Sequence, residues 1–302
     1  MTADARPEQI HRYNHRFFDS DRWRDFKPRA DDILVCTAYK AGTTWMQMIC
    51  ALLVFQTTRF DRPLGKISPW LERDTASIED VLALLEAQNH RRFIKTHTPL
   101  DGLPYFKDAT YLFVGRDPRD IFLSKRNHIL NANAAAAPTP GGDWPEVPED
   151  IGTFFRKWIT TGVFDWEHDG WPSWSVLHHN ETFWRFRHLP NIHFFHYDDL
   201  KRDLDGEMRR VADVLGIAVD EALWPSLVEA ATFDKMKQNA EQLAPGAERG
   251  AWHDTARFFN KGTSGQWRDV LGEEELRLYR AATDERLPPD LTRWLETGGP
   301  VK

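Results

Sequence analysis

The chain of 302 residues is long enough to bury a large hydrophobic core in one or two domains, and 41% of it is hydrophobic. Its formal net charge of -7 does not favour nucleic acid or an anionic membrane as a partner, so an anion site must be a local basic pocket. Cys36 and Cys50 offer neither a disulfide framework nor a zinc spacing, the N-terminus is too polar for a signal peptide, and no apolar run is long enough to cross a bilayer. These features predict a cytoplasmic protein.

Residues 1–30 are polar with interleaved aromatic residues, which predicts an irregular N-terminal arm docked on the body of the protein. Ile33–Cys36 is a short apolar run typical of a buried strand. Thr44–Phe55 is apolar enough to form a buried helix. The turn between them, residues 39–44, therefore joins the end of a strand to the beginning of a helix.

That turn has the composition of an anion-binding loop, although a structural turn with an exposed lysine is the alternative. Free N–H groups and the positive end of the helix dipole converge there. Gly42 lets the backbone approach a ligand, Thr43 and Thr44 supply hydroxyl groups, and Lys40 supplies a charge. A standard P-loop places its lysine directly after the last glycine, whereas Lys40 precedes Gly42 by two positions. This departure points away from ordinary ATP and GTP enzymes.

The remaining chain alternates short apolar runs with amphipathic segments, without an internal repeat or a linker. We expect strands at residues 92–95, 110–115 and 192–196, and helices at 77–89, 118–130, 151–163, 175–188, 206–215, 220–231, 233–239 and 273–287. The pattern predicts one α/β domain over residues 1–302, with a central parallel sheet flanked by helices and a P-loop-like core. Residues 131–150 and 241–259 lack periodicity and are expected to be mobile flaps.

Polar residues follow the predicted strands at their carboxyl ends, where parallel sheets bind ligands. They are Lys40, Lys95 with His97, Arg116, and Tyr197. Arg116 precedes a helix expected to begin at Pro118, and Ser124 lies about two turns along it. These groups predict a basic crevice for a ligand with two anionic groups.

His97 is placed to serve as a general base near neutral pH. For the other histidines near strands and helices, a structural role is the better interpretation. No carboxylate or histidine cluster has metal-ligand spacing, so no metal is predicted.

Several segments, in order along the chain, resemble motifs of the cytosolic sulfotransferase family, and the chain resembles a bacterial-like member. They are Tyr39-Lys40-Ala41-Gly42-Thr43-Thr44-Trp45, Lys95-Thr96-His97, Arg116-Asp117-Pro118-Arg119-Asp120 with Ser124, Tyr197-Asp198-Asp199-Leu200, and Lys261-Gly262-Thr263-Ser264-Gly265-Gln266-Trp267. The resemblance covers about residues 30 to 270. It implies transfer of a sulfuryl group from 3′-phosphoadenosine 5′-phosphosulfate (PAPS) to a hydroxyl group, with 3′-phosphoadenosine 5′-phosphate (PAP) as product and no metal.

The resemblance also implies a role for each matching residue. The 5′-phosphosulfate is assigned to Lys40, Ala41, Gly42, Thr43 and Thr44, the 3′-phosphate to Arg116, Ser124, Asn260, Lys261 and Gly262, the adenine to Trp45, Tyr197 and Phe233, and catalysis to His97, Lys40, Lys95 and Ser124. For the acceptor, Phe17, Phe18, Trp70 and Trp144 are candidates, with core or loop packing as the alternative. An aromatic-rich pocket favours a small phenol or another apolar alcohol.

Two departures from the family pattern stand out. The family usually has an arginine where this chain has Asn260, and Arg249 or Arg257 is a candidate replacement. The family's short dimerisation motif is not evident in residues 268–276, so the oligomeric state is open. A P-loop kinase or NTPase, and a nucleotide-binding protein without catalysis, are the alternative functions.

Overall fold

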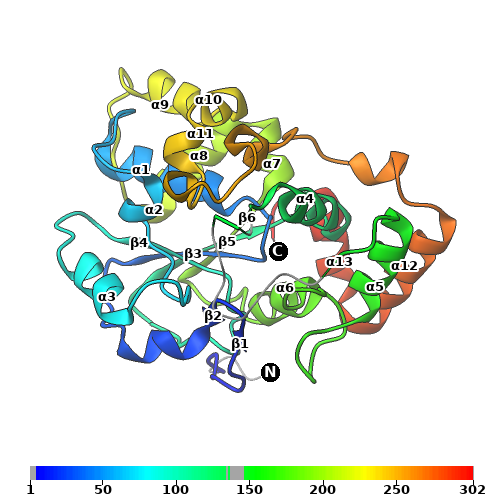
Figure 1. The fold of residues 1–302 in the computed structure, drawn as a ribbon. Coiled ribbons are helices and arrows are strands. Elements are labelled where there is room, and N and C mark those ends of the chain that lie inside the picture. The colour runs from blue at the N-terminus through cyan, green and yellow to red at the C-terminus, as the bar shows by residue number, and fades with distance from the viewer. Residues whose placement is uncertain (1–4, 134, 137–145, 302) are drawn as a thin grey trace.

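A central parallel sheet organises the protein, and a computed structural model describes residues 5–133, 135–136 and 146–301. The sheet has four strands in the order β4-β3-β5-β6 (Figure 1). Its strands are β3 (Ile33–Thr37), β4 (Phe93–Thr96), β5 (Thr110–Gly115) and β6 (Ile192–His196). All neighbouring pairs are parallel, so the predicted α/β architecture is confirmed.

Helices surround the sheet and account for most of the remaining regular structure. They are α1 (Thr43–Phe55), α2 (Leu64–Ile67), α3 (Ile78–Glu86), α4 (Pro118–Asn131), α5 (Ile151–Thr160), α6 (Val176–Trp184), α7 (Tyr197–Arg202), α8 (Leu204–Leu215), α9 (Trp224–Ala230), α10 (Phe233–Gln238), α11 (Ala240–Leu243), α12 (Glu273–Arg286) and α13 (Pro289–Thr297). Sequence analysis missed α2, α7, α11 and α13. The first three have at most six residues, too few turns to produce a periodic apolar pattern.

Alternating residues of each strand face opposite sides of the sheet, which divides the hydrophobic core into two clusters. Ile33 and Val35 pack with α1, α8, α9 and α10, above the sheet in Figure 1. Leu34 and Cys36 pack with α5, α6, α12, α13 and the N-terminal arm. Both faces are covered, which explains why the strands are almost continuously apolar.

The N-terminal arm is more regular than expected. It contains a two-strand hairpin, β1 (Asn14–His15) and β2 (Phe18–Asp19), and a 3₁₀ helix η1 (Ser20–Asp25). Tyr13, Phe18 and Trp23 are buried in the core beneath the sheet. The arm therefore forms part of the core.

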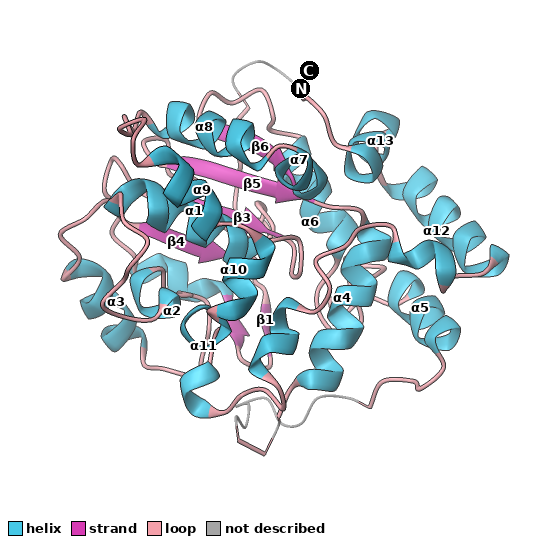
Figure 2. Cartoon of the chain, turned by 90° about the horizontal axis from the view of Figure 1, so that it is seen from above, coloured by secondary structure: helices cyan, strands magenta, loops and turns pink. Residues whose placement is uncertain are grey.

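The strand order creates a crevice at the carboxyl ends of β3 and β5. The chain passes from β3 to β4 on one side of β3, and β5 then pairs on its other side. Figure 2 shows the strands running in one direction. In open α/β sheets, ligands bind where the direction of strand addition reverses, so the loops after β3 and β5 mark the expected site.

Candidate active site

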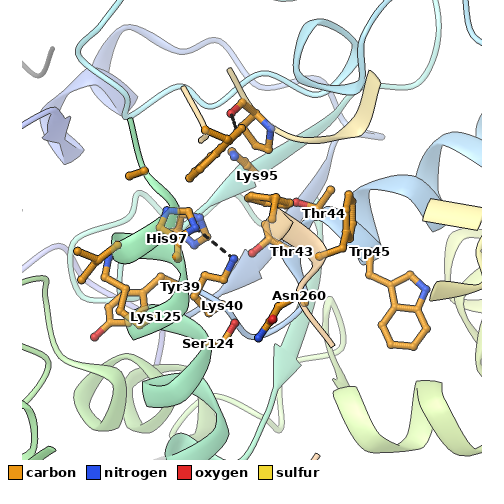
Figure 3. A pocket seen from close by; sticks show the side chains of 18 of the residues that line it. Tyr39, Lys40, Thr43, Thr44, Trp45, Lys95, His97, Ser124, Lys125 and Asn260 are labelled. Carbon is orange, nitrogen blue, oxygen red and sulfur yellow. Dashed lines mark hydrogen bonds between the residues drawn. The ribbon is translucent and has the colours of Figure 1, made fainter. Parts of the chain in front are cut away.

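A cavity lies at the carboxyl ends of the strands, and most of the predicted site residues line it (Figure 3). These are Lys40, Gly42, Thr43, Thr44, Trp45, Lys95, His97, Arg116, Ser124, Tyr197, Phe233, Asn260, Lys261 and Gly262, with Phe17 and Trp70. Ala41 is buried behind the wall. Phe18 is also behind it, stacked on Trp174 with ring centroids 4.3 Å apart, so it packs in the core. Trp144 lies outside the described residues.

The loop between β3 and α1 has a backbone shape that matches its sequence. Gly42 is the N-cap of α1 with φ of 112°, in the left-handed region that favours glycine. A Cβ atom there would lie 3.1 Å from the Tyr197 ring. Lys40 also has a positive φ, 65°. Because no side chain caps α1, the amides at its N-terminus are available to an anion.

Arg116, at the end of β5, connects three segments of the site. Its guanidinium donates to the Lys40 carbonyl at 3.0 Å and to the Thr263 carbonyl at 3.4 Å. It also lies 4.0 Å from the centroid of the Tyr197 ring. Arg116 is buried, and its Nε has no hydrogen-bond partner among the described residues. This unpaired donor and the glycine cradle fit a phosphate group.

The 261–267 segment reaches the same place because residues at the beginning of α4 hold it. Asp120 accepts a hydrogen bond from the Gly265 amide at 2.7 Å, and Asp117 accepts one from Trp267 Nε1 at 3.1 Å. Gly262 has φ of 64°, and a Cβ atom there would clash with the Phe233 ring at 2.4 Å. The two motifs, far apart in sequence, thus form one structural unit.

Aromatic side chains form the opposite wall of this part of the cavity. Trp45 donates from Nε1 to the Ala231 carbonyl at 2.8 Å, which fixes the ring. It meets the Tyr197 ring edge-on, with centroids 5.3 Å apart. Phe233 lies against Gly262 at the beginning of α10. These rings offer an apolar surface suited to a flat base.

His97 follows β4 and lines the cavity with Lys40 and Lys95 (Figure 3). Its Nδ1 lies 2.9 Å from the Thr37 carbonyl oxygen. A carbonyl only accepts, so Nδ1 carries the proton and the neutral ring keeps its lone pair on Nε2. Burial and the neighbouring Lys95 charge lower the pKa of His97 to about 3, which keeps the ring neutral at pH 7. Nε2 therefore has a free lone pair at pH 7, but the lowered pKa makes the ring a weaker base than the near-neutral one expected from the sequence.

Glu72 supports the His97 segment and was not singled out by sequence analysis. Its buried carboxylate accepts hydrogen bonds from Thr98 at 2.6 Å, Trp23 Nε1 at 2.7 Å, and the Thr96 hydroxyl and Trp70 Nε1. Burial raises the pKa of this carboxyl, while the hydrogen bonds oppose that change. Glu72 ties β4, the N-terminal arm and Trp70 together, and only the tertiary structure brings these groups to one place.

The cationic residues of the cavity lie close to one another in a dry environment. Burial and the charge of Arg116 lower the pKa of Lys40 to about 7, and burial and the charge of Arg73 lower that of Lys95 to about 7. Lys40 Nζ lies 3.3 Å from His128 Nδ1 and 4.3 Å from the centroid of the Phe258 ring. Anionic ligands would relieve this mutual repulsion, so the cavity favours them electrostatically.

Sequence analysis also missed Arg73, Lys125 and His128, which line the cavity. None follows a strand directly, so the strand-exit rule did not find them. Lys125 and His128 follow Ser124 on α4, and the helical spacing of Ser124 and His128 was the available signal.

Neither candidate replacement for the arginine missing at position 260 lines the cavity. Arg257 is exposed, and Arg249 pairs with Glu248 at 3.5 Å. The Asn260 carbonyl instead accepts a hydrogen bond from Lys237 Nζ at 2.8 Å. This contact anchors the loop that carries Lys261 and Gly262 to α10.

The fold and the site together define an α/β protein with a basic cavity at the carboxyl ends of its parallel strands. A family model described as a sulfotransferase domain matches residues 30–288. A glycolipid sulfotransferase of Mycobacterium bovis is 37% identical, over 95% of this chain and 94% of that protein. Human sulfotransferase 1C2 is 28% identical over 82% of this chain and 81% of that protein.

Solved structures show the same fold. The crystal structure of retinol dehydratase in complex with androsterone and the inactive cofactor PAP has a TM-score of 0.69 and 23% identity, covering 90% of this chain and 87% of that one. The chain therefore belongs to the sulfotransferase family, and it is an enzyme of the PAPS-dependent class.

Two further observations concern the described residues. No helix in this part of the chain is long and apolar enough to cross a membrane. No group of three or more His, Cys, Asp or Glu side chains is arranged there to hold a metal ion.

Proposed function

We propose that this sulfotransferase moves a sulfuryl group from PAPS to a hydroxyl group of a small acceptor with an apolar or aromatic part, without a metal. The glycolipids named for the mycobacterial relatives combine hydroxyl groups with an apolar part, and so do phenols. Phe17, Trp70, Trp174 and Trp252 give the cavity an aromatic side suited to such acceptors. The displaced lysine and the family match do not favour a kinase or NTPase.

The donor fits the side of the cavity between the β3–α1 loop and the 260–262 loop. The α1 amides, Lys40, Thr43 and Thr44 bind the 5′-phosphosulfate, and Arg116, Ser124, Lys261 and Gly262 bind the 3′-phosphate. Trp45, Tyr197 and Phe233 enclose the adenine. The unpaired Nε of Arg116 and the space left by Gly42 and Gly262 support this assignment.

The observation that carries the mechanism is the hydrogen bond from His97 Nδ1 to the Thr37 carbonyl. It leaves Nε2 to take the proton of the acceptor hydroxyl as the acceptor oxygen bonds to sulfur. The bond between sulfur and the bridging phosphate oxygen breaks, and its electron pair remains on PAP. Lys40 and Lys95 stabilise the charge on the leaving phosphate and the sulfuryl group.

A direct assay tests this function. The purified enzyme with PAPS should form sulfated product and PAP in equal amounts from 4-nitrophenol or octyl β-glucoside, measured by mass spectrometry. EDTA should leave the rate unchanged. Transfer that required added magnesium, or phosphate transfer from ATP in place of sulfuryl transfer from PAPS, would contradict the proposal.

A further inference from the structure

More lysine and arginine side chains line the cavity than the proposed function uses. Six lysine or arginine side chains line it, and no aspartate or glutamate does so among the described residues: Lys40, Arg73, Lys95, Arg116, Lys125 and Lys261. The proposed function uses four of them, which leaves Arg73 and Lys125 without a role.

Lys125 can release its proton and become neutral near pH 7, whereas Arg73 stays protonated. Burial and the charge of Lys40 lower the pKa of Lys125 to about 7, and its ammonium lies 4.5 Å from the centroid of the Tyr39 ring. Burial and the charge of Arg249 lower the pKa of Arg73 to about 10, so its guanidinium stays charged at pH 7. A charge that is largely removed from water is unfavourable unless a ligand or partner compensates it.

Arg73 has no such partner within the described structure. No ion pair or side-chain hydrogen bond is formed by its guanidinium there, and its buried Nε is unpaired. The guanidinium lies 5.8 Å from the centroid of the Phe17 ring and 5.9 Å from that of Trp70. The negative charge of Glu248 opposes the lowering of the Arg73 pKa, but Glu248 forms its ion pair with Arg249.

Bridges to two other segments hold the backbone around Arg73, which fixes the place at which this side chain enters the cavity. Single-residue β-bridges join Trp70 to Lys95 and Arg73 to Phe18. The Asp19 amide also donates to the Glu72 carbonyl at 2.9 Å. The Trp70 ring lies near both His97 and Arg73. Its centroid is 5.1 Å from that of the His97 ring and 5.9 Å from the guanidinium carbon of Arg73. His97 and Arg73 line the same cavity, so an acceptor that extends along the Trp70 ring would contact both.

We propose that the acceptor carries, besides its hydroxyl group, an anionic carboxylate, phosphate or sulfate group that Arg73 binds. This proposal rests on the proposed function and deepens it. The planar guanidinium matches the two oxygens of such a group, and the aromatic rings beside it exclude water from the contact. Arg73 thus selects the acceptor, whereas His97 performs the chemistry.

The test compares two acceptors of the same shape, 3-(4-hydroxyphenyl)propionate and its uncharged primary amide. Their binding to the enzyme saturated with PAP is measured by calorimetry, which needs no turnover. The acid should bind about tenfold or more tightly than the amide, because charge-assisted hydrogen bonds are worth about that much. Arg73→Gln should abolish the difference by weakening the acid alone, and Arg73→Lys should restore part of it.

Control variants distinguish a failure of this inference from a failure of the proposed sulfuryl transfer. Arg24→Gln removes an exposed arginine outside the cavity and should change neither affinity. PAP binding should survive Arg73→Gln, which also shows that the variant folds. Equal or undetectable binding of both probes, or equal losses in Arg73→Gln, would overturn the inference. Absence of sulfuryl transfer with the binding difference intact would instead count against the proposed function.

Discussion

The proposed donor half and the proposed acceptor half of the cavity are built differently. Most residues of the donor half directly follow a strand or begin a helix; they are Lys40, Gly42, Thr43, Thr44, Trp45, Arg116, Ser124, Tyr197, Asn260, Lys261 and Gly262. The acceptor half consists of Phe17, Trp70, Arg73, Trp174, Trp252 and Phe258, and most of these lie on connecting segments from separate parts of the chain.

The two halves would therefore recognise their ligands in different ways. The donor half uses backbone amides and left-handed glycines that only a particular loop shape supplies. The acceptor half uses side chains on connecting segments, where sequence changes are generally tolerated more readily than in strands. Trp70 and Trp174 are exceptions, because Trp70 bridges to Lys95 of β4 and Trp174 packs in the core.

His97 lies where the two halves meet, and its loss should have the largest effect. His97→Ala should lower kcat by roughly 10²–10⁴-fold, because it removes the proposed general base. PAP affinity should change little, since His97 faces the acceptor. Steady-state rates and calorimetry measure the two quantities.

A matched control is His193→Ala, which removes a half-buried histidine outside the cavity. Its kcat should stay near that of the native enzyme. If His97→Ala kept kcat within a few-fold, proton removal would not depend on this ring.

The second comparison concerns the two ends of the donor. Arg116→Ala should weaken PAP about tenfold to a hundredfold, because it removes a charged donor to the 3′-phosphate, yet leave 5′-AMP nearly unaffected. Lys40→Ala should weaken both nucleotides and also slow turnover, because Lys40 faces the 5′-phosphosulfate. Calorimetric titration gives the dissociation constants.

Arg126→Ala, on the following helix α4, is the control, since Arg126 donates to the Glu149 carbonyl at 3.0 Å and does not line the cavity. Equal losses of PAP and 5′-AMP in Arg116→Ala would exclude a contact with the 3′-phosphate. They would show instead that Arg116 acts by holding the Lys40 and Thr263 carbonyls.

The donor half was predictable because its signals are local in sequence. A strand, a glycine turn and a capped helix determine where Lys40, Gly42 and Arg116 lie, and the sheet brings their loops together. The parallel sheet was predicted from the alternation of strands and helices, whereas the strand order was not, and no helix lies between β4 and β5. Short helices such as α7 carry too little periodicity to be predicted.

The acceptor half was less predictable because its geometry depends on tertiary packing. Phe17 and Trp70 were proposed and do line the cavity, whereas Phe18, the next residue after Phe17, faces the core. Sequence alone does not decide which of two adjacent aromatic residues faces the cavity. Arg73 and Glu72 were missed for the same reason, since their roles depend on buried neighbours from distant segments.

The smallest effect is expected at Asn260, where the donor half departs from its family pattern. Asn260→Arg should tighten PAP by up to about tenfold, because an arginine adds a charge-assisted contact to the phosphate that asparagine lacks. The gain is limited because Asn260 has a positive φ of 28°, which asparagine tolerates better than arginine. Calorimetric titration of PAP against both proteins measures the change.

Two further variants test which residues compensate for the missing arginine in the loop of residues 260–262. Arg257→Ala should leave PAP affinity unchanged, because Arg257 is exposed and does not line the cavity, contrary to the compensation considered from sequence. Lys237→Met should weaken PAP by a few-fold, because it releases the Asn260 carbonyl and loosens the loop that positions Lys261. If Arg257→Ala weakened PAP instead, that arginine would move into the site when the nucleotide binds. If Asn260→Arg left the dissociation constant unchanged, position 260 would not face the 3′-phosphate, and the donor half would need no substitute for the missing charge.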